Sequence, residues 1–477
     1  MNKYTNPTIC GLPTASELHA SLAAGEGSDA REQIRKLFDE NTFVETSAFT
    51  KRGFSDFIAT ERSSELEGVI TGYGAIGGRL VFAFVEDASR MNGAIDERHA
   101  KKIVDLYRLA LSNGAPVIGV FNSAGTDVFE GTAGLAAYGK IISCVSRASG
   151  VIPQIAFVAG NCIGTAATIA AMFDIVVKSD TASLYVASPA LTGAENAQAA
   201  IVHYTADENS VIGYIKAILS FLPDKSSGGV EIVATTDNLN RYLGDIDFGG
   251  EALSVIATIA DNGVFYELSH DFAEGVTTAF ASLGGVKCGI IANSFAKNDG
   301  KLCAASARKI ARFVNLCDSF SIPVVTLVDS LGLAIDKDNE DAFAPELAKL
   351  AFAYASSTCP KVTVIIGHAI GASFILLGSK ALGADLVYAV DNSEIGALSA
   401  ESGVAFAWDK YITEEKTRES LIAEWRESVS SPVAAASSGE IDDIISVSEL
   451  RARICSALLM LSAKGGASTS GRKVLPL

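Results

Sequence analysis

The chain has 477 residues, too many for one compact core at roughly 100–200 residues per domain, which excludes a single small module. Hydrophobic residues make up 49% of it and charged residues 19%, a composition that excludes an intrinsically disordered chain. Its formal net charge of −17 argues against nucleic acid as a partner, because nucleic acid is itself negatively charged.

The N-terminal segment has neither the basic region nor the apolar core of a secretory signal. The longest apolar runs have the length of strands and fall short of the roughly 20 residues of a membrane helix. We therefore expect a cytoplasmic protein that does not span a membrane. The eight cysteines form no CxxC pair and the five histidines no HxxxH pair, so the sequence predicts buried thiols and no metal site.

The periodicity of the first half predicts helices that alternate with strands. An amphipathic helix is expected over His99–Asn113 and a Pro-led apolar strand over Val117–Phe121. A second helix then leads to a strand over Gln154–Val158, a glycine turn and an Ala-rich helix over Thr165–Met172. Strands that are apolar on both faces indicate an α/β fold with a mainly parallel sheet covered by helices.

The second half repeats this order at a constant offset of 207 residues, as between Gly164 and Gly371. Residues 99–126 align without gaps to residues 306–333, so the chain contains two copies of one fold. The second copy predicts a helix over Ser306–Phe320, strands over Val324–Val328 and Lys361–Ile366, and an Ala-rich helix over Ala372–Leu382.

Polar and Ser/Gly-rich residues after Pro223 are typical of a linker. We expect a first domain over residues 1–223, a linker over 224–245 and a second domain over 246–477. A Ser/Ala/Gly-rich patch at Ser430–Glu440 predicts a surface loop.

In each copy two turns of small residues follow the carboxyl ends of neighbouring strands. They are residues 122–127 and 161–166 in the first copy and 329–334 and 368–373 in the second. Backbone N–H groups that converge from two such turns would form an oxyanion hole. The alternative, that glycine only permits a tight turn there, remains open at this point.

At these turns the chain resembles the biotin-dependent carboxyltransferase family, which includes acyl-CoA carboxylase β subunits and the α subunits of methylmalonyl-CoA and glutaconyl-CoA decarboxylases. The matching stretches include Gly68–Asp87, His99–Gly119, Ala148–Ala167, Ser306–Gly332 and Cys359–Ala389. The resemblance implies two tandem domains of the ClpP/crotonase class, with the acyl-CoA side in the first domain and the biotin side in the second.

The resemblance also implies a reaction, the movement of a carboxyl group between carrier-bound biotin and an acyl-CoA, in the carboxylase or the decarboxylase direction. The resemblance implies an oxyanion hole for the thioester enolate, formed by the backbone N–H of Thr126 and that of Gly164 or Thr165. It implies a second hole for the biotin ureido oxygen, formed by the N–H of Leu333 and that of Gly371 or Ala372. The binding residues that it implies beside them are Ala124, Gly125, Gly332 and Ser373.

The partners implied by the resemblance are an acyl-CoA and biotin on a separate carrier chain, the biotin carboxyl carrier protein. A biotin carboxylase or a membrane decarboxylase subunit would complete the complex, and the chain itself would form a homo-oligomer, a dimer or a trimer of dimers.

The turns depart from the family's Gly-Gly pairs, because Ala124-Gly125, Gly164-Thr165 and Gly371-Ala372 stand in their places. A catalytically silent paralogue that serves as an assembly or regulatory subunit of a biotin-dependent carboxylase complex is therefore the alternative. A hydratase or hydrolase of the crotonase type would need a carboxylate such as Asp127 or Glu130.

Other polar residues near the turns are interpreted as structural. His99 begins a predicted helix and His368 precedes a tight turn, and both are expected to be hydrogen-bonded polar groups. Neither the acyl group nor the direction of the reaction follows from the sequence.

Overall fold

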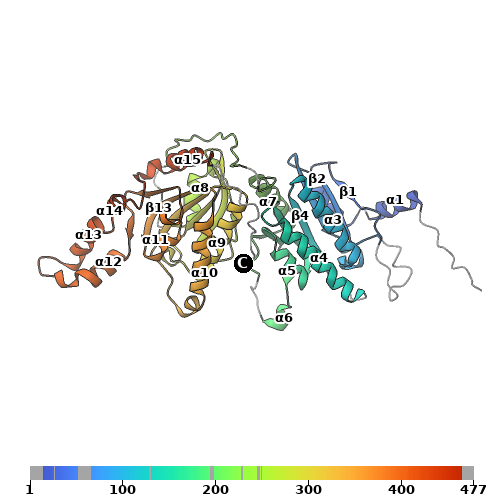
Figure 1. Cartoon of the computed structure of the whole chain (residues 1–477), viewed down its shortest axis with the longest axis horizontal. Coiled ribbons are helices and arrows are strands. Elements are labelled where there is room, and N and C mark those ends of the chain that lie inside the picture. The colour runs from blue at the N-terminus through green and yellow to red at the C-terminus, as the bar shows by residue number, and fades with distance from the viewer. Residues whose placement is uncertain are drawn as a thin grey trace, which may run out of the picture.

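The computed structural model contains two eight-stranded sheets, the first in the N-terminal half and the second in the C-terminal half (Figure 1). In both sheets most neighbouring strands are parallel, which confirms the predicted α/β class and is consistent with two tandem crotonase-like domains. The structure describes residues 14–25, 27–51, 66–127, 130–193, 198–226, 229–243, 246, 248 and 250–464.

The first sheet has the spatial order β1-β2-β3-β4-β5-β6-β8, with β7 paired to β5. β1 to β3 are antiparallel, and the pairs from β3 onward are parallel. The strands are β1 Val44–Thr46, β2 Val69–Ile76, β3 Arg79–Glu86, β4 Val117–Ser123, β5 Gln154–Ile163, β6 Ile175–Ser179, β7 Ser183–Tyr185 and β8 Tyr204–Ala206. The helices are α1 Ala15–Ala24, α2 Asp29–Leu37, α3 Glu97–Asn113, α4 Thr132–Ala148, α5 Thr165–Ala171, α6 Pro189–Thr192 and α7 Glu208–Phe221.

The second sheet has the order β9-β10-β11-β12-β13-β14-β16, with β15 paired to β13. The strands are β9 Phe265–Leu268, β10 Val276–Leu283, β11 Val286–Asn293, β12 Val324–Ser330, β13 Lys361–Ile370, β14 Leu386–Val390, β15 Glu394–Gly396 and β16 Asp443–Ile445. The helices are α8 Ala252–Ile259, α9 Ala304–Ser319, α10 Lys337–Ser356, α11 Ala372–Leu376, α12 Ala400–Gly403, α13 Arg418–Ser428, α14 Pro432–Ser437 and α15 Leu450–Leu461.

The predicted repeat is present in three dimensions. The bounds of β2 to β5 and of β10 to β13 correspond residue by residue at the offset found in the sequence. Even a buried lysine is repeated, because Lys102 donates to the carbonyl of Val69 and Lys309 donates to the carbonyl of Val276. Burial lowers the pKa of each of these lysines to about 8.

The two sheets share one apolar layer. On one face of the first sheet α3, α4 and α5 enclose a core of their own. The opposite face carries α2 and α7, and α7 contacts β9 and β10 of the second sheet. This face of the second sheet is also covered by α9 and α10, and α8 and α15 cover its far side. In Figure 1 α3 and α4 lie on the right, and α8 and α15 lie at the top of the second domain, above α9 and α10. Alternate residues of each central strand enter opposite layers, which explains the continuous apolar runs in the sequence.

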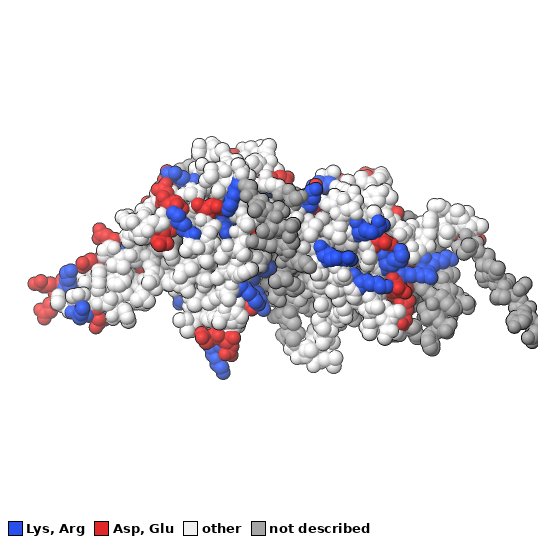
Figure 2. Space-filling model, in the orientation of Figure 1, with Lys and Arg blue, Asp and Glu red and all other residues white. Residues whose placement is uncertain are grey.

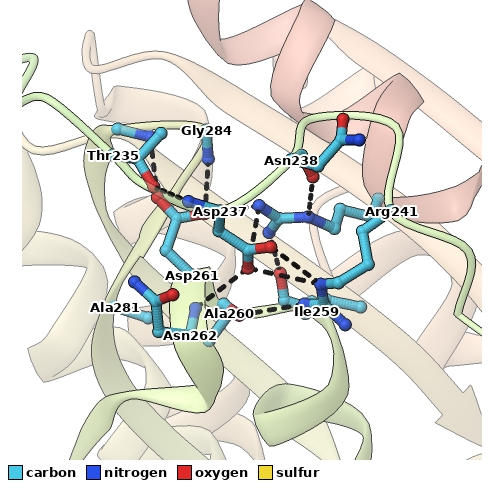
Figure 3. Close-up of polar contacts among 12 residues, drawn as sticks. Thr235, Asp237, Asn238, Arg241, Ile259, Ala260, Asp261, Asn262, Ala281 and Gly284 are labelled. Atoms are coloured by element: carbon cyan, nitrogen blue, oxygen red, sulfur yellow. Dashed lines mark hydrogen bonds and ion pairs between the residues drawn. The ribbon is translucent and has the colours of Figure 1, made fainter.

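Part of the segment expected as a linker is bonded to the second domain. Ile232 forms a bridge with Val286 of β11. Asp237 and Asp261 lie close together in Figure 3, and both carboxylates pair with the guanidinium of Arg451, at 3.3 and 2.6 Å. The side chain of Arg451 is fully buried, so this ion pair joins α15 to the segment that precedes the second sheet.

Two predicted elements differ from the structure. The Ala-rich helix expected over Ala372–Leu382 ends at Leu376, because Gly378 has a left-handed φ of 76° and its carbonyl accepts a hydrogen bond from the Thr363 hydroxyl. The patch Ser430–Glu440, expected as a loop, contains the helix α14, which Ser431 caps at its N-terminus.

Candidate active site

The two turns of the first domain lie at one edge of its sheet. Ser123 at the end of β4 pairs with Cys162 near the end of β5, with an irregularity in register just before. The residues that follow both strands therefore leave the sheet at its carboxyl edge, where ligands of parallel sheets commonly bind.

In the first turn the backbone of the residues around Thr126 is fixed by hydrogen bonds. Ala124 N–H donates to the carbonyl of Asn92, and Asp127 N–H to that of Ile95. Gly125 N–H donates to the hydroxyl of Ser123 at 3.0 Å. Within the part of the chain that the structure describes, the N–H of Thr126 has no such acceptor. It is therefore the main-chain donor that this turn offers to a ligand.

In the second turn the N–H of Gly164 is already occupied, because it donates to the carbonyl of Tyr185 at 3.0 Å. Thr165 is the first residue of α5, where helix N–H groups have no intrahelical acceptor. Thr165 is exposed to solvent. Of the two amides that the resemblance implied here, the one of Thr165 is thus the donor left for a ligand.

The second domain repeats these bonds. Gly371 N–H donates to the carbonyl of Gly396 at 2.8 Å, and Ala372 begins α11. The N–H of Leu302 donates to the carbonyl of Gly332, and the N–H of Ala334 donates to the carbonyl of Leu302. The N–H of Leu333, which lies between these two bonds along the chain, takes part in neither. Among the described residues neither Leu333 nor Ala372 has an acceptor for its N–H.

At each of these turns the chain retains the glycine whose backbone has a positive φ. Gly125 and Gly332 have φ values of 107° and 111°, and Gly164 and Gly371 have values of 63° and 61°. L residues with a side chain rarely adopt these conformations. The departures from the Gly-Gly pairs fall on the adjacent residues, which carry no left-handed φ, so the geometry of the turns is preserved.

Side chains beside the turns also hold them in place. The hydroxyl of Ser373 donates to the carbonyl of Ile370 at 2.8 Å and to that of Ser330 at 3.2 Å, which ties the ends of β12 and β13 together. In the first domain Thr126 forms a side-chain hydrogen bond with Tyr138 of α4. An added Cβ on Gly134 would lie 2.6 Å from the Thr126 methyl group, so the Thr126 side chain packs on α4.

A pocket of about 510 Å³ adjoins the second-domain turn. It is lined mainly by apolar and small residues in and beside α11, β15 and α14, among them Gly371, Phe374, Ile395, Gly396 and Ala435, and also by Glu440. The helix α14, which the sequence interpretation missed, forms one wall of it. Its volume lies within the range of about 300–1,000 Å³ that is usual for small-molecule sites.

His368 is a hydrogen-bonded polar group, as expected from the sequence, and it lies beside the second-domain turns. Its ring Nδ1 and its backbone N–H each lie 2.9 Å from Oδ1 of Asp329, and this contact raises the pKa of the imidazole. No pattern in the sequence joins these two residues, which are 39 positions apart. The only signal in the sequence is a difference between the two copies, because Asn122 and Asn161 stand in the first copy at the positions of Asp329 and His368.

Other polar residues serve the fold. Glu130 caps α3 by accepting from the N–H of Glu97 at 2.9 Å. His99 is fully buried, but its ring nitrogens lie 3.7 and 3.9 Å from the carboxylates of Glu67 and Glu86, too far for the hydrogen bonds expected from the sequence, and they have no other partner among the described residues. Glu86 accepts from the N–H of Asn122 at 2.7 Å, and its burial raises its pKa to about 7. This hydrogen bond of Glu86 therefore holds the backbone at the start of the first turn in place.

Figure 2 shows basic side chains gathered over the first domain, with acidic side chains beside them. In the described part of the chain no helix is both long and apolar enough to cross a membrane. Nor do three His, Cys, Asp or Glu side chains of the described residues gather in a way that could hold a metal ion.

Known proteins share this architecture. Residues 25–472 match the family model of the carboxyl transferase domain. The methylmalonyl-CoA decarboxylase subunit alpha of Veillonella parvula is 35% identical over 91% of this chain and 90% of its own length. The methylmalonyl-CoA carboxyltransferase 12S subunit of Propionibacterium freudenreichii subsp. shermanii is 33% identical over 91% and 88%.

Solved structures agree with these relatives. A crystal structure of transcarboxylase 12S, a hexamer with methylmalonyl-coenzyme A and methylmalonic acid bound, superposes with a TM-score of 0.85 at 32% identity and covers 96% of this chain and 93% of its own. A single-chain, multi-domain long-chain acyl-CoA carboxylase has the same fold, with a TM-score of 0.78 at 23% identity over 94% of this chain and 49% of its own. The chain therefore belongs to the carboxyl transferase domain family.

Proposed function

We propose that the chain transfers a carboxyl group between biotin on a separate carrier chain and a short acyl-CoA of the methylmalonyl-CoA and propionyl-CoA type. One observation carries this proposal: each domain presents two backbone N–H groups without an acceptor in the described structure, at equivalent turns. The names of the relatives, which act on methylmalonyl-CoA or propionyl-CoA, support the choice of substrate.

In the first domain the N–H groups of Thr126 and Thr165 would bind the thioester oxygen. As the α-carbon loses its carboxyl group or its proton, negative charge develops on this oxygen, and preorganised amides stabilise it without reorganisation. The space in front of Gly164 is open, since an added Cβ there would meet no atom within 4 Å. A thioester could thus approach this turn beside Gly164, and Thr165 keeps its backbone N–H although it stands in place of the second glycine.

In the second domain the residues present fit biotin. When bound, biotin supplies the ureido nitrogen that carries the carboxyl group. The pocket beside Gly371 would receive its ring, and the N–H groups of Leu333 and Ala372 would bind its ureido oxygen. The pocket walls from α11 and α14 are apolar at most positions and would exclude water from the carboxyl group.

The two pairs of amides lie in different domains of one chain. We propose that the first domain of one subunit faces the second domain of another, so that at least a homodimer is needed for a complete site. A hexamer of the kind that the transcarboxylase 12S structure forms would provide such pairs. A biotin carboxyl carrier protein, with a biotin carboxylase or a membrane decarboxylase subunit, would complete the complex.

The decisive experiment is decarboxylation of methylmalonyl-CoA by the purified full chain, with and without biotin carrier protein or biocytin. We expect propionyl-CoA to form only when biotin is present. Thermal-shift titration with acyl-CoA thioesters separates the alternative: a thioester at 100 times its Kd stabilises the fold by about 2.7 kcal/mol. If the chain shows no turnover and no thioester raises its Tm, the catalytically silent subunit is favoured.

A further inference from the structure

The two copies of the fold differ in chemistry at one pair of positions next to the turns. In the first domain the side-chain oxygen of Asn122 accepts from the N–H of Asn161 at 3.2 Å. In the second domain Asp329 and His368 occupy these positions and keep the same backbone bond, at 2.9 Å. The shared bond is structural, so the change from two amides to a carboxylate and an imidazole adds titratable groups that the fold does not require.

The geometry of the second pair is that of an acid–base dyad. Asp329 is 2% exposed at the end of β12, and Oδ1 of its carboxylate lies 2.9 Å from His368 Nδ1. Gly367 leaves room for this carboxylate, because an added Cβ there would lie 2.4 Å from Oδ1. The imidazole is fixed from one side by Phe295, whose ring stacks on it at 4.9 Å. The dyad is thus positioned by packing as well as by hydrogen bonds.

The second ring nitrogen of His368 is available. The side chain is 34% exposed, and within the described residues Nε2 has no hydrogen-bond partner. His368 lies three residues before Gly371 on β13, and Asp329 lies four residues before Leu333 on β12, so the dyad stands directly before both second-domain turns. An imidazole held at Nδ1 by a buried carboxylate transfers protons through Nε2.

The charged groups around His368 favour its protonated form. Asp329 raises the pKa of the imidazole through its hydrogen bond, burial lowers it, and Glu394 on β15 raises it further. Arg426 on α13 opposes this effect, but its guanidinium pairs with Glu394 and with Glu401. The imidazole therefore carries a proton more readily than a free histidine does.

We propose that His368, oriented by Asp329, is the proton donor and acceptor of the second-domain site. This inference rests on the proposed function and deepens it. In the direction from carboxylated biotin, the bond between the ureido nitrogen and the carboxyl carbon breaks, its electron pair stays on the nitrogen, and CO2 is released. His368 Nε2 gives its proton to that nitrogen, and the neutral imidazole regains a proton from the solvent, which also receives the α-proton of the acyl-CoA. In the reverse direction neutral His368 takes the proton from the ureido N–H.

The first test needs no variant and no turnover. Diethyl pyrocarbonate modifies neutral imidazoles, and mass spectrometry of peptides gives the rate for each histidine. In the full wild-type chain we expect saturating biocytin to slow the modification of His368 several-fold. His270, which is 67% exposed and lies on the loop after β9, is the internal reference and should be unaffected. Modification of His368 at the same rate with and without biocytin would overturn the inference.

The second test uses His368→Gln, with His270→Gln as the matched control. We expect His368→Gln to lower the kcat of carboxyl transfer about 100-fold, with the KM for methylmalonyl-CoA unchanged, because proton transfer by a side chain contributes about that much. Asp329→Asn should increase the rate of His368 modification below pH 7, since the imidazole then loses its carboxylate partner. His270→Gln should match the wild type.

The outcomes separate the two claims. If the wild-type chain transfers carboxyl groups and His368→Gln does so equally fast, the dyad inference is wrong and the proposed function stands. If the wild-type chain transfers none with any acyl-CoA, the proposed function is wrong, and the dyad inference fails with it.

Discussion

The N–H of Gly164 donates to the carbonyl of Tyr185, at the point where β7 runs beside the end of β5. This bond removes the glycine amide from the candidate site and leaves the amide of the next residue, Thr165, at the start of α5. The N–H of Gly371 and the carbonyl of Gly396 repeat the arrangement in the second domain. In both domains a glycine shapes the turn while its neighbour presents the donor.

Thr165→Pro tests this division of roles. Proline lacks the N–H but is tolerated at the first position of a helix, so the fold should persist. We expect the exchange of the α-hydrogen of propionyl-CoA with D2O to fall about 100-fold, the cost of one oxyanion-hole donor. Thr165→Ala keeps the N–H and is the control, which should exchange at a rate near that of the wild type. Equal rates for the two variants would contradict a role for the Thr165 amide.

We expect Gly125→Ala to lower the stability or the carboxyl-transfer rate, and Ala124→Gly to leave both unchanged. At a φ of 107° an added Cβ costs about 1–3 kcal/mol of strain, which either destabilises the fold or rotates the Thr126 amide. Ala124→Gly restores the Gly-Gly pair of the family without changing a strained position. Thermal unfolding and carboxyl transfer of both variants provide the measurement, and tolerance of Gly125→Ala in both assays would contradict the assigned backbone role.

Arg451→Met tests the ion pairs that join α15 to the segment before the second sheet. The variant leaves the buried carboxylate of Asp261 without its cation, and we expect it to lower the free energy of unfolding by about 3–5 kcal/mol. Arg453→Met is the matched control on the same helix, since Arg453 is 45% exposed. The control should change the stability by less than about 0.5 kcal/mol in denaturant unfolding.

Glu86→Gln should stabilise the protein in a pH-dependent way. Burial raises the pKa of Glu86 to about 7, above its value of 4.5 in the unfolded chain, so the folded state binds this proton more tightly. The stability from this group is fully present below pH 4.5 and is lost as the pH rises through 7. Glutamine mimics the neutral form, and we expect it to raise the Tm at pH 8 but to have little effect at pH 5. An equal change in Tm at both pH values would contradict the raised pKa of Glu86.

The sequence predicted the repeat because proline and glycine recur at one offset and because the central strands are apolar on both faces. It overextended the helix after Gly371, since no local pattern shows that Gly378 adopts a left-handed φ. It missed α14, whose Ala-rich sequence is only partly buried, and the dyad of Asp329 and His368. Contacts between neighbouring parallel strands join distant residues, and neither residue alone carries a signature.

The central claim is that main-chain amides of two duplicated turns bind the reacting oxygen. An experimental structure of the full chain with methylmalonyl-CoA tests it most directly, through the distances from the thioester oxygen to two nitrogen atoms. We predict that the backbone nitrogens of Thr126 and Thr165 both lie about 2.7–3.1 Å from this oxygen. A thioester oxygen bound by side chains alone, or away from both amides, would contradict the account.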